Sequence, residues 1–366
     1  MVTYAEAGVD VEAGDKAVEL MKDSIRRAQR PEVLGGLGGF AGLFDATRLT
    51  RMTRPVLATS TDGVGTKVAI AQALDKHDTI GFDLVGMVVD DIVVCGAEPL
   101  YLTDYIATGK VVPERIAEIV SGIADACAET NTALIGGETA EHPGLLEPGE
   151  YDVAGAATGV VEYADLLGPH RVAPGDVVVA MASSGLHSNG YSLVRRVIAS
   201  AGWSLDRHVD EFGRTLGEEL LAPTRLYTQP VLDLIRLPDL HVHALSHVTG
   251  GGLAANLARV LPPGTVATVH RSTWTPPPGF ATVQRLGRVP RNDLERTLNQ
   301  GVGFLVILPA DQADRAVAHA ASAGIPAWVV GEVTTIDRAT TTVEVVSGAK
   351  GVDGGAVQVL GEHPDA

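Results

Sequence analysis

The feature that most constrains this chain is an apolar strand that runs directly into a loop rich in glycine. Residues 55–58 predict the buried strand, and the loop reads Ser60-Thr61-Asp62-Gly63-Val64-Gly65-Thr66-Lys67. Glycines let backbone N–H groups curl around phosphate oxygens, and a lysine adds a positive charge. A carboxylate repels phosphate unless a divalent cation lies between them, so the loop predicts a nucleotide bridged by Mg²⁺. We expect this nucleotide to contact Asp62, Gly63, Val64, Gly65, Thr66 and Lys67.

Two better-known glycine patterns fit poorly. The Walker pattern Gly-x4-Gly-Lys-Ser/Thr occurs nowhere, and the Asp62 loop taken alone could be an ordinary turn after a strand. The run Gly36-Leu37-Gly38-Gly39-Phe40-Ala41 satisfies Gly-x-Gly-x-x-Ala, but it lacks a preceding strand and a following βαβ unit. It is better interpreted as a flap that covers phosphate, with Gly36, Gly38 and Gly39 contacting the substrate.

Length and charge limit the class of protein. A chain of 366 residues is long enough for two domains, and 28 Lys and Arg against 45 Asp and Glu give a formal charge of −17. This charge argues against nucleic acid as a partner. Cys95 and Cys127 lie in apolar helical patterns and predict core thiols in a reducing compartment. With no signal peptide and no apolar run that could span a bilayer, we expect a cytoplasmic protein without a membrane partner.

Helix and strand patterns alternate in two stretches, which predicts two α/β domains. The first stretch predicts helices at 15–29, 82–95 and 113–129, and strands at 55–60, 100–106, 133–135 and 151–161. At 167–175 the composition shifts to Gly, Pro and Arg, as at a domain boundary. The second stretch predicts strands at 177–181, 267–270, 304–308, 328–332 and 341–346, helices at 191–200, 226–235, 253–260 and 312–322, and a rigid connection at 273–279.

Carboxylates recur in the first stretch. The sequence Gly136-Gly137-Glu138 follows a predicted strand, and Asp90 and Asp91 interrupt an apolar helix. Neighbours on a helix point about 100° apart, so at most one of this pair faces a given site. Because buried carboxylates need a partner or a metal, Asp62, one of Asp90 and Asp91, and Glu138 predict a Mg²⁺ cage. The alternative for Asp90 or Asp91 is a structural salt bridge or a cap.

In the second stretch, His187-Ser188-Asn189 lies between a strand and a helix. A histidine, a hydroxyl and an amide beside free N–H donors suit a substrate site. The segment nearly imitates the nucleophile elbow Gly-x-Ser-x-Gly, but Leu186 stands at the first glycine position, which weakens a hydrolase interpretation. The alternative role for Ser188 or Asn189 is to cap the following helix.

Three glycines precede another predicted helix at Gly250-Gly251-Gly252. Such a run suits an anion, and we expect the substrate phosphate here, contacted by His247, Thr249, Gly250 and Gly251. His241 and His243 share a strand face, but we expect no acidic partner beside them and the glycines fit an anion better, so a zinc site is disfavoured.

Together these segments closely resemble the phosphoribosylformylglycinamidine cyclo-ligase family, the aminoimidazole ribonucleotide synthetases of purine biosynthesis. The resemblance covers nearly the whole chain in order: the Asp62 loop and residues 4–10, 30–40, 77–81, 96–99, 136–141, 151–155, 187–195, 221–225, 243–252 and 299–303. Two positions depart from the family pattern. Asp90 replaces an expected Asn, and Gln300 stands where Cys is often found, so we assign position 300 no chemistry.

The resemblance implies a homodimer in which the sheets of the first domains pair into a barrel, with ATP bound near the interface. With the boundary placed by composition, we expect an ATP-binding and dimerisation domain at 1–168 and a substrate-binding α/β domain at 169–346. The last residues, 347–366, fall outside the resemblance, and we expect them to form a frayed tail. Asp62, Asp91 and Glu138 match the metal-associated positions, with Gly136 and Gly137 at the nucleotide. His187 matches the site histidine of the second domain, and residues 249–252 match the phosphate region.

The implied reaction is an ATP-dependent ring closure. The formyl oxygen of formylglycinamidine ribonucleotide takes the γ-phosphoryl group, a substrate nitrogen attacks the activated carbon, and phosphate leaves as aminoimidazole ribonucleotide forms. Phosphoryl transfer needs positioning and charge neutralisation more than a protein nucleophile. His187 would donate a hydrogen bond or shuttle a proton near the formyl group, and Asp91 would act with the metal.

Several alternatives stay open. A related ATP-dependent enzyme is the nearest, but a selenophosphate synthetase would need a reactive residue near its N-terminus, and a thiamine-phosphate kinase would lack the blocks at 35–40 and 187–190. A non-catalytic nucleotide-binding module would bind ATP without turnover, which the three acidic positions argue against. A serine hydrolase fits least.

Overall fold

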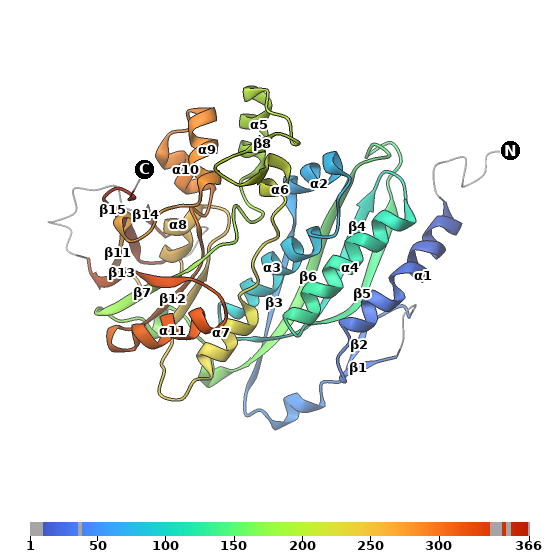
Figure 1. Ribbon diagram of the computed structural model, residues 1–366. Helices are drawn as coiled ribbons and strands as arrows, with labels where there is room; N and C mark the ends of the chain where they lie inside the picture. The colour runs from blue at the N-terminus through green and yellow to red at the C-terminus, as the bar shows by residue number, and fades with distance from the viewer. Residues whose placement is uncertain (1–9, 36–38, 337–345, 349–352, 365–366) are drawn as a thin grey trace. The chain divides into compact units, whose positions relative to one another are not determined.

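The computed structural model describes residues 10–35, 39–336, 346–348 and 353–364 (Figure 1). The chain divides into two compact units, Met1–Ile92 with Ala97–Asp165, and Val93–Gly96 with Leu166–Ala366. Each unit combines helices with a sheet of its own, as the sequence predicts. No helix in the described ranges has the length and apolar composition needed to cross a bilayer.

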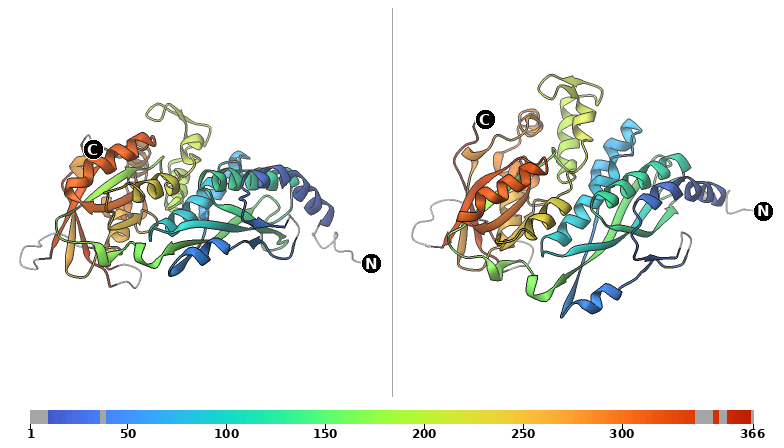
Figure 2. Two further views of the ribbon diagram at one scale, coloured as in Figure 1. Left: turned by 90° about the horizontal axis from the view of Figure 1, so that it is seen from below. Right: turned by 60° about the horizontal axis from the view of Figure 1, so that its bottom comes forward.

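The first unit is built on a four-stranded sheet in the order β3-β6-β4-β5. Its strands are β3 (Pro55–Gly63), β6 (Tyr151–Glu162), β4 (Glu98–Thr108) and β5 (Ala133–Glu141), of which only β4 and β5 pair in parallel. The main helices are α1 (Val11–Arg27), α2 (Val68–Leu74), α3 (Ile80–Val93) and α4 (Pro113–Glu129), with α1, α3 and α4 on one face of the sheet (Figure 2). A short ribbon pairs β1 (Val33–Leu34) with β2 (Leu43–Phe44). Alternate residues of β6 are buried, as expected of a sheet covered on one face.

Helices α3 and α4 cross at two glycines. A Cβ atom on Gly81 would lie 1.9 Å from the backbone nitrogen of Ile123, and one on Gly122 would lie 2.2 Å from the carbonyl oxygen of Asp78. Side-chain carbons do not approach backbone atoms this closely, so the two backbones meet only because both positions lack a side chain.

The second unit is built on a seven-stranded sheet in the order β10-β12-β7-β13-β11-β15-β14. Its strands are β7 (Asp176–Ala182), β10 (Ala244–His247), β11 (Thr265–His270), β12 (Val302–Pro309), β13 (Ala327–Thr335), β14 (Val346–Ser347) and β15 (Ala356–Leu360). Its helices are α5 (Tyr191–Ala201), α6 (Leu216–Leu220), α7 (Thr228–Ile235), α8 (Gly252–Ala258), α9 (Pro278–Gly287), α10 (Arg291–Thr297) and α11 (Ala313–Ser322). A two-residue ribbon pairs β8 (His208–Val209) with β9 (Arg214–Thr215). Short 3₁₀ turns occur in both units, at Thr47–Arg51, Gly65–Lys67, Tyr163–Asp165, Pro169–Arg171, Arg271–Thr273 and Ala310–Gln312.

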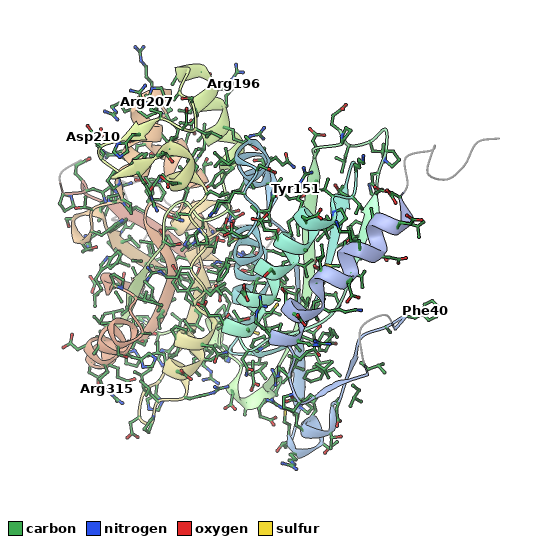
Figure 3. The ribbon with its side chains drawn as sticks, turned by 45° about the vertical axis from the view of Figure 1, so that its right-hand side comes forward. Phe40, Tyr151, Arg196, Arg207, Asp210 and Arg315 are labelled. Atoms are coloured by element: carbon green, nitrogen blue, oxygen red, sulfur yellow. The ribbon has the colours of Figure 1, made fainter. Side chains whose placement is uncertain are left out.

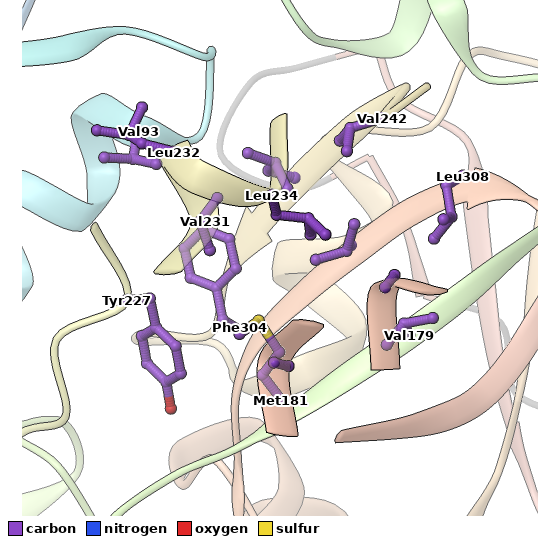
Figure 4. Close-up of a cluster of buried hydrophobic side chains, with 14 of the residues drawn as sticks. Val93, Val179, Met181, Tyr227, Val231, Leu232, Leu234, Val242, Phe304 and Leu308 are labelled. Atoms are coloured by element: carbon purple, nitrogen blue, oxygen red, sulfur yellow. The ribbon is translucent and has the colours of Figure 1, made fainter. Parts of the chain in front are cut away.

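The inner strand β12, which lies between β10 and β7, is buried along both faces from Val302 to Leu308. Phe304, Val306 and Leu308 join a core with α7 and α11 (Figure 4), whereas Leu305 and Ile307 join a second core with α8. A continuous apolar run of this kind is typical of a strand between two layers. The sheet is therefore covered on both faces.

Two strands continue further than the sequence predicts. β3 does not end at Ser60 but runs through Asp62 to Gly63, and β5 does not end at Ile135 but runs through Gly136 and Gly137 to Glu141. In both cases the backbone hydrogen bonds of the neighbouring strand, β6 or β4, continue past the glycines. Pairing between strands therefore outweighs the weak strand preference of glycine.

The end of the chain also differs from the prediction of a frayed tail. β15 pairs in parallel with β11, and the guanidinium of Arg271 donates to the carbonyl oxygens of Val359 at 2.9 Å and Gly361 at 3.1 Å. The expected strand at 341–346 lies almost entirely outside the described residues; β14 begins at Val346. The expected rigid connection at 273–279 is shorter, because α9 already begins at Pro278.

The glycine crossing predicts an unusual effect of alanine. We expect Gly122→Ala to lower the free energy of unfolding by about 1–3 kcal/mol, because the overlap with Asp78 outweighs a helix-propensity gain of about 1 kcal/mol. The matched control is Gly14→Ala in α1, where a Cβ would meet nothing within 4 Å and the propensity gain should stand alone. Urea denaturation measures both. Equal stabilisation by the two substitutions would contradict the close crossing.

Candidate functional site

The Asp62 loop lies at the end of β3. Asp62 is exposed, and one of its carboxylate oxygens accepts a hydrogen bond from the amide of Gly63 at 2.8 Å. The amide of Val64 donates to the carbonyl of Val153 at 3.1 Å, which ties the loop to β6. Gly65 has a φ of +72°, a left-handed conformation that glycine adopts without strain. The loop therefore presents a carboxylate and a glycine turn at the surface, as a metal–phosphate site requires.

Lys67 has a partner that the sequence did not predict. Its ammonium donates to Oδ1 of Asp83 at 2.7 Å, and both side chains are fully buried. Burial lowers the pKa of Lys67, while the charge of Asp83 acts in the opposite direction. The phosphate contact predicted for Lys67 stays a prediction, and the structure gives this lysine a buried ion pair that fixes the start of α2.

Glu138 and Asp62 lie on opposite faces of the sheet. In the strand register Asp62 pairs with Gly155, and a Cβ at Gly155 would touch Leu84 of α3, so Asp62 is on the helix-covered face. Glu138 pairs with Tyr105, and both are exposed. A bulge at Ile135 shifts the register by one residue and so moves Glu138 to the open face.

The residues of the predicted three-carboxylate cage differ in their exposure and in the face that they occupy. Across the described ranges, no group of three or more His, Cys, Asp or Glu side chains is placed to hold a metal ion. Asp91 is exposed and Asp90 is fully buried, so the two neighbours do point apart as helix geometry requires. Asp62, Asp91 and Glu138 stay predicted ligands.

Asp104 of β4 is a carboxylate to which the sequence analysis gave no role. A Cβ on Gly137 would lie 1.7 Å from its Oδ1, so Gly137 is a glycine because this carboxylate occupies the space of its side chain. Burial raises the pKa of Asp104 to about 7. The Cys127 thiol is buried, as predicted. Burial raises the pKa of this thiol, and the nearby charge of Asp104 raises it further. An aspartate inside the apolar run 100–106 was the available signal.

In the second unit, His187 is held in one orientation. It has a φ of +61°, its side chain is buried, and its Nε2 accepts a hydrogen bond from the amide of Ser184 at 3.1 Å. An accepting Nε2 places the proton of the neutral ring on Nδ1. A Cβ on Gly303 would lie 2.7 Å from Cε1 of His187, so this glycine leaves room for the ring.

The two glycine loops of the second unit lie together. The Oδ1 of Asn189 would be 3.3 Å from a Cβ on Gly250, which brings the His187–Asn189 segment against the triple-glycine segment. Gly190, and not Ser188 or Asn189, is the N-cap residue of α5, which differs from what the capping alternative predicts. Thr249 accepts from the amide of Gly252 at 3.1 Å, and Gly251 has a φ of +106°.

Other predicted residues are placed as follows. His247 is buried in β10, and the centroid of its ring lies 5.9 Å from that of Phe304.

His243 does have an acidic neighbour, because its Nδ1 lies 2.7 Å from Oδ2 of Asp176. This contact corrects the sequence argument about the zinc pair. Gly36 and Gly38 of the predicted flap lie outside the described residues. Gly39 is exposed, and Phe40 beside it points away from the molecule (Figure 3).

Comparisons with known proteins define the class first. Residues 45–161 match the model of the AIR synthase related protein N-terminal domain, and residues 173–344 match that of the C-terminal domain. The fold also resembles thiamine-monophosphate kinase from Stenotrophomonas maltophilia K279a (TM-score 0.63, 19% identity, 94% of this chain and 97% of that one). It likewise resembles the hydrogenase maturation protein HypE in complex with ATP (TM-score 0.64, 18% identity, 94% and 91%). At these identities the likeness concerns the fold.

Closer relatives narrow the class to one enzyme. The chain is 49% identical over 331 residues to the phosphoribosylformylglycinamidine cyclo-ligase of Desulfitobacterium hafniense (strain DSM 10664 / DCB-2), covering 90% of this chain and 96% of the relative. It is 51% identical over 349 residues to the enzyme of that name from Anaeromyxobacter sp. (strain Fw109-5), covering 94% and 99%. This chain belongs to the phosphoribosylformylglycinamidine cyclo-ligase family.

The titration of Asp104 gives a prediction about stability. Between pH 3.8 and about 7, the Asp104 carboxyl stays protonated in the folded chain, whereas in the unfolded chain it has already released its proton. Stability should therefore fall as the pH rises through this window and stay constant above it, with an upper bound of about 4 kcal/mol for the loss.

Asp104→Asn should remove this pH dependence. We expect the variant to melt at a higher temperature than the parent at pH 8, and by a smaller margin at pH 5, where the carboxyl of the folded parent is still protonated but that of the unfolded parent is ionised. Calorimetry at the two pH values measures the difference. A variant that melts below the parent at pH 8 would show that the ionised carboxylate is stabilised in the fold.

Proposed function

We propose that this chain closes the imidazole ring of aminoimidazole ribonucleotide from formylglycinamidine ribonucleotide, with release of ADP and phosphate, as a step of purine biosynthesis. The observation that carries the proposal is the match to cyclo-ligases at about half identity through both units. The phosphorylated substrate and the reduced thiols fit an enzyme of the cytoplasm. A related ATP-dependent enzyme is the second candidate, favoured only by the shared fold.

ATP would be held at the Asp62 loop with Mg²⁺. Asp62 and Asp91 are both exposed carboxylates, and hard oxygen donors are what Mg²⁺ prefers. A chain with a formal charge of −17 repels a polyphosphate unless cations and backbone N–H groups offset the repulsion. When bound, the metal would neutralise charge on the γ-phosphoryl group. The glycines at 63 and 65 leave the backbone open to the phosphate oxygens.

The chain's own residues would orient the substrate. The formyl oxygen attacks the γ-phosphorus, ADP leaves, a substrate nitrogen adds to the formyl carbon, and the phosphate departs with that oxygen. His187 carries its proton on Nδ1, because Nε2 is occupied by the amide of Ser184. We assign Nδ1–H to a hydrogen bond or proton transfer near the formyl group, and the loop at Thr249–Gly251 to the substrate phosphate.

A homodimer would complete this site. The face of the first sheet opposite its helices exposes Leu57 and Tyr105, which are 58% and 42% accessible. Two such faces packed together would form the barrel that the family resemblance implies. Glu138 lies on the same open face, so we propose that its contact with the metal depends on dimerisation.

The activity is tested with a single substitution at the proposed metal site. Because Asp91 is exposed, Asp91→Asn should leave the melting temperature within about 2 °C of the parent and lower kcat for ADP formation at least 100-fold. The assay supplies ATP, Mg²⁺ and formylglycinamidine ribonucleotide and measures ADP together with aminoimidazole ribonucleotide. ADP release that does not depend on the ribonucleotide would favour the second candidate. A variant with parental turnover would remove Asp91 from the site.

The dimer is tested on the open face. Leu57→Glu should give a monomer in sedimentation experiments and lose turnover, because two buried carboxylates would face each other across the interface. Val11→Glu is the matched control, since Val11 is 62% exposed at the start of α1, on the helix side. A Leu57→Glu chain that still forms dimers would place the interface elsewhere.

A further inference from the structure

The turn that precedes β12 meets the loop that carries His187. The turn comprises residues 299–301, and the loop, residues 183–187, follows β7 directly. The amide of Ser183 donates to the carbonyl oxygen of Gly301 at 2.9 Å, so the pairing of β7 with β12 continues into both segments. The turn and the loop therefore lie side by side where β7 ends and β12 begins.

The side-chain amide of Asn299 joins these two segments. Its Nδ2 donates to the carbonyl oxygen of Gly185 at 3.0 Å, and its Oδ1 accepts from the amide of Gly301 at 2.8 Å. The hydroxyl oxygen of Ser183 lies 2.8 Å from the same Gly185 oxygen and 3.2 Å from Oδ1 of Asn299. Asn299 is buried. Its place requires a donor on one side and an acceptor on the other, which a neutral amide supplies and a carboxylate does not.

The turn that holds the loop is itself fixed. Gly301 has a φ of +88°, which glycine adopts without strain, whereas Gln300 has a φ of +54°, a value uncommon for a residue with a side chain. The bond from Oδ1 of Asn299 to the amide two residues on encloses Gln300, as in an Asx turn. The indole N–H of Trp274 adds a hydrogen bond to the carbonyl oxygen of Gln300 at 2.9 Å. Asn299 thus links the loop to a well-anchored part of the fold.

The orientation of the His187 ring depends on this loop. Its Nε2 accepts from the amide of Ser184, the residue directly before Gly185, so a shift of the Gly185 carbonyl group also moves that donor. The ring itself lies against Gly303, four residues after Asn299, where a Cβ would lie 2.7 Å from Cε1. The turn and the start of β12 therefore act on His187 in two ways, through the donor to Nε2 and through the space for the ring.

We propose that Asn299 is a positioning residue: its bond to the Gly185 carbonyl oxygen keeps the Ser184 amide on Nε2 of His187, and so keeps the proton of the neutral ring on Nδ1. Which ring nitrogen carries the proton is set by the hydrogen bond that the other one makes. The inference rests on the proposed function, in which Nδ1–H of His187 acts near the formyl group. Asn299 acts on the reaction through His187.

The tautomer of His187 is measured by nuclear magnetic resonance on the full chain labelled with ¹⁵N-histidine. At pH 8 the parent should carry a proton on Nδ1 of His187 and none on Nε2, with the signals assigned by their loss in His187→Gln. Asn299→Ala should give a mixture of both tautomers, because the Ser184 amide is no longer held on Nε2. A folded Asn299→Ala chain with the parental signals, or a parent with the proton on Nε2, would overturn the proposal.

Two further variants separate positioning from a general loss of stability. Thr265→Val removes the hydroxyl of a buried threonine that donates to a backbone carbonyl oxygen at 2.7 Å, on β11, which β13 separates from β7. It should lower the melting temperature and leave the His187 signals unchanged. Asn299→Asp keeps the acceptor for Gly301 and loses only the donor to Gly185, so it should give the tautomer mixture and decides the question if Asn299→Ala does not fold. The proposal fails if Asn299→Asp keeps the parental tautomer or Thr265→Val loses it.

Turnover distinguishes this inference from the proposed function. With ATP, Mg²⁺ and formylglycinamidine ribonucleotide, folded Asn299→Ala should lower kcat by about 10-fold or more and leave KM for ATP unchanged, because ATP is assigned to the first unit. A parent without turnover would contradict the proposed function, and the tautomer measurement would then decide the role of Asn299. A parental kcat in Asn299→Ala, with an active parent, would overturn that role.

Discussion

Close contact between backbones at glycine positions determines where the helices and the site loops of this protein lie. At Gly122 the backbones of α3 and α4 touch, and at Gly252 a Cβ would lie 1.7 Å from the carbonyl oxygen of Glu295, which sets the start of α8 against α10. At Gly303 the missing side chain makes room for Tyr227 and His187. Because no other residue fits such places, these glycines are determined by packing before they serve a ligand. The high glycine content of the chain is thus required by backbone packing as well as by the loops assigned to ligands.

Elements with strong local signals could be predicted from the sequence. Helix α4 has the predicted bounds, because Pro113 suits the first helical turn and its apolar residues recur at helical spacing along one face. The inner strand β12 is close to its predicted range because an unbroken apolar run has few alternatives. The position of His187 between a strand and a helix was likewise readable from the sequence.

Features that depend on pairing between distant segments could not be predicted. Whether Gly136 and Gly137 end β5 or continue it is decided by β4, and the bulge at Ile135 then decides which face Glu138 occupies. The buried pair of Lys67 and Asp83 joins residues 16 positions apart, and no local pattern marks it. Asp104 is similar, because only the fold shows that its carboxylate fills the space beside Gly137. The family resemblance supplied residue roles without this geometry.

The parallel pairing of β15 with β11 has a consequence for synthesis on the ribosome. β15 is translated about 90 residues after its partner β11. During elongation one edge of β11 therefore stays unpaired while the intervening residues are synthesised. This part of the sheet can be completed only after β15 has left the ribosome.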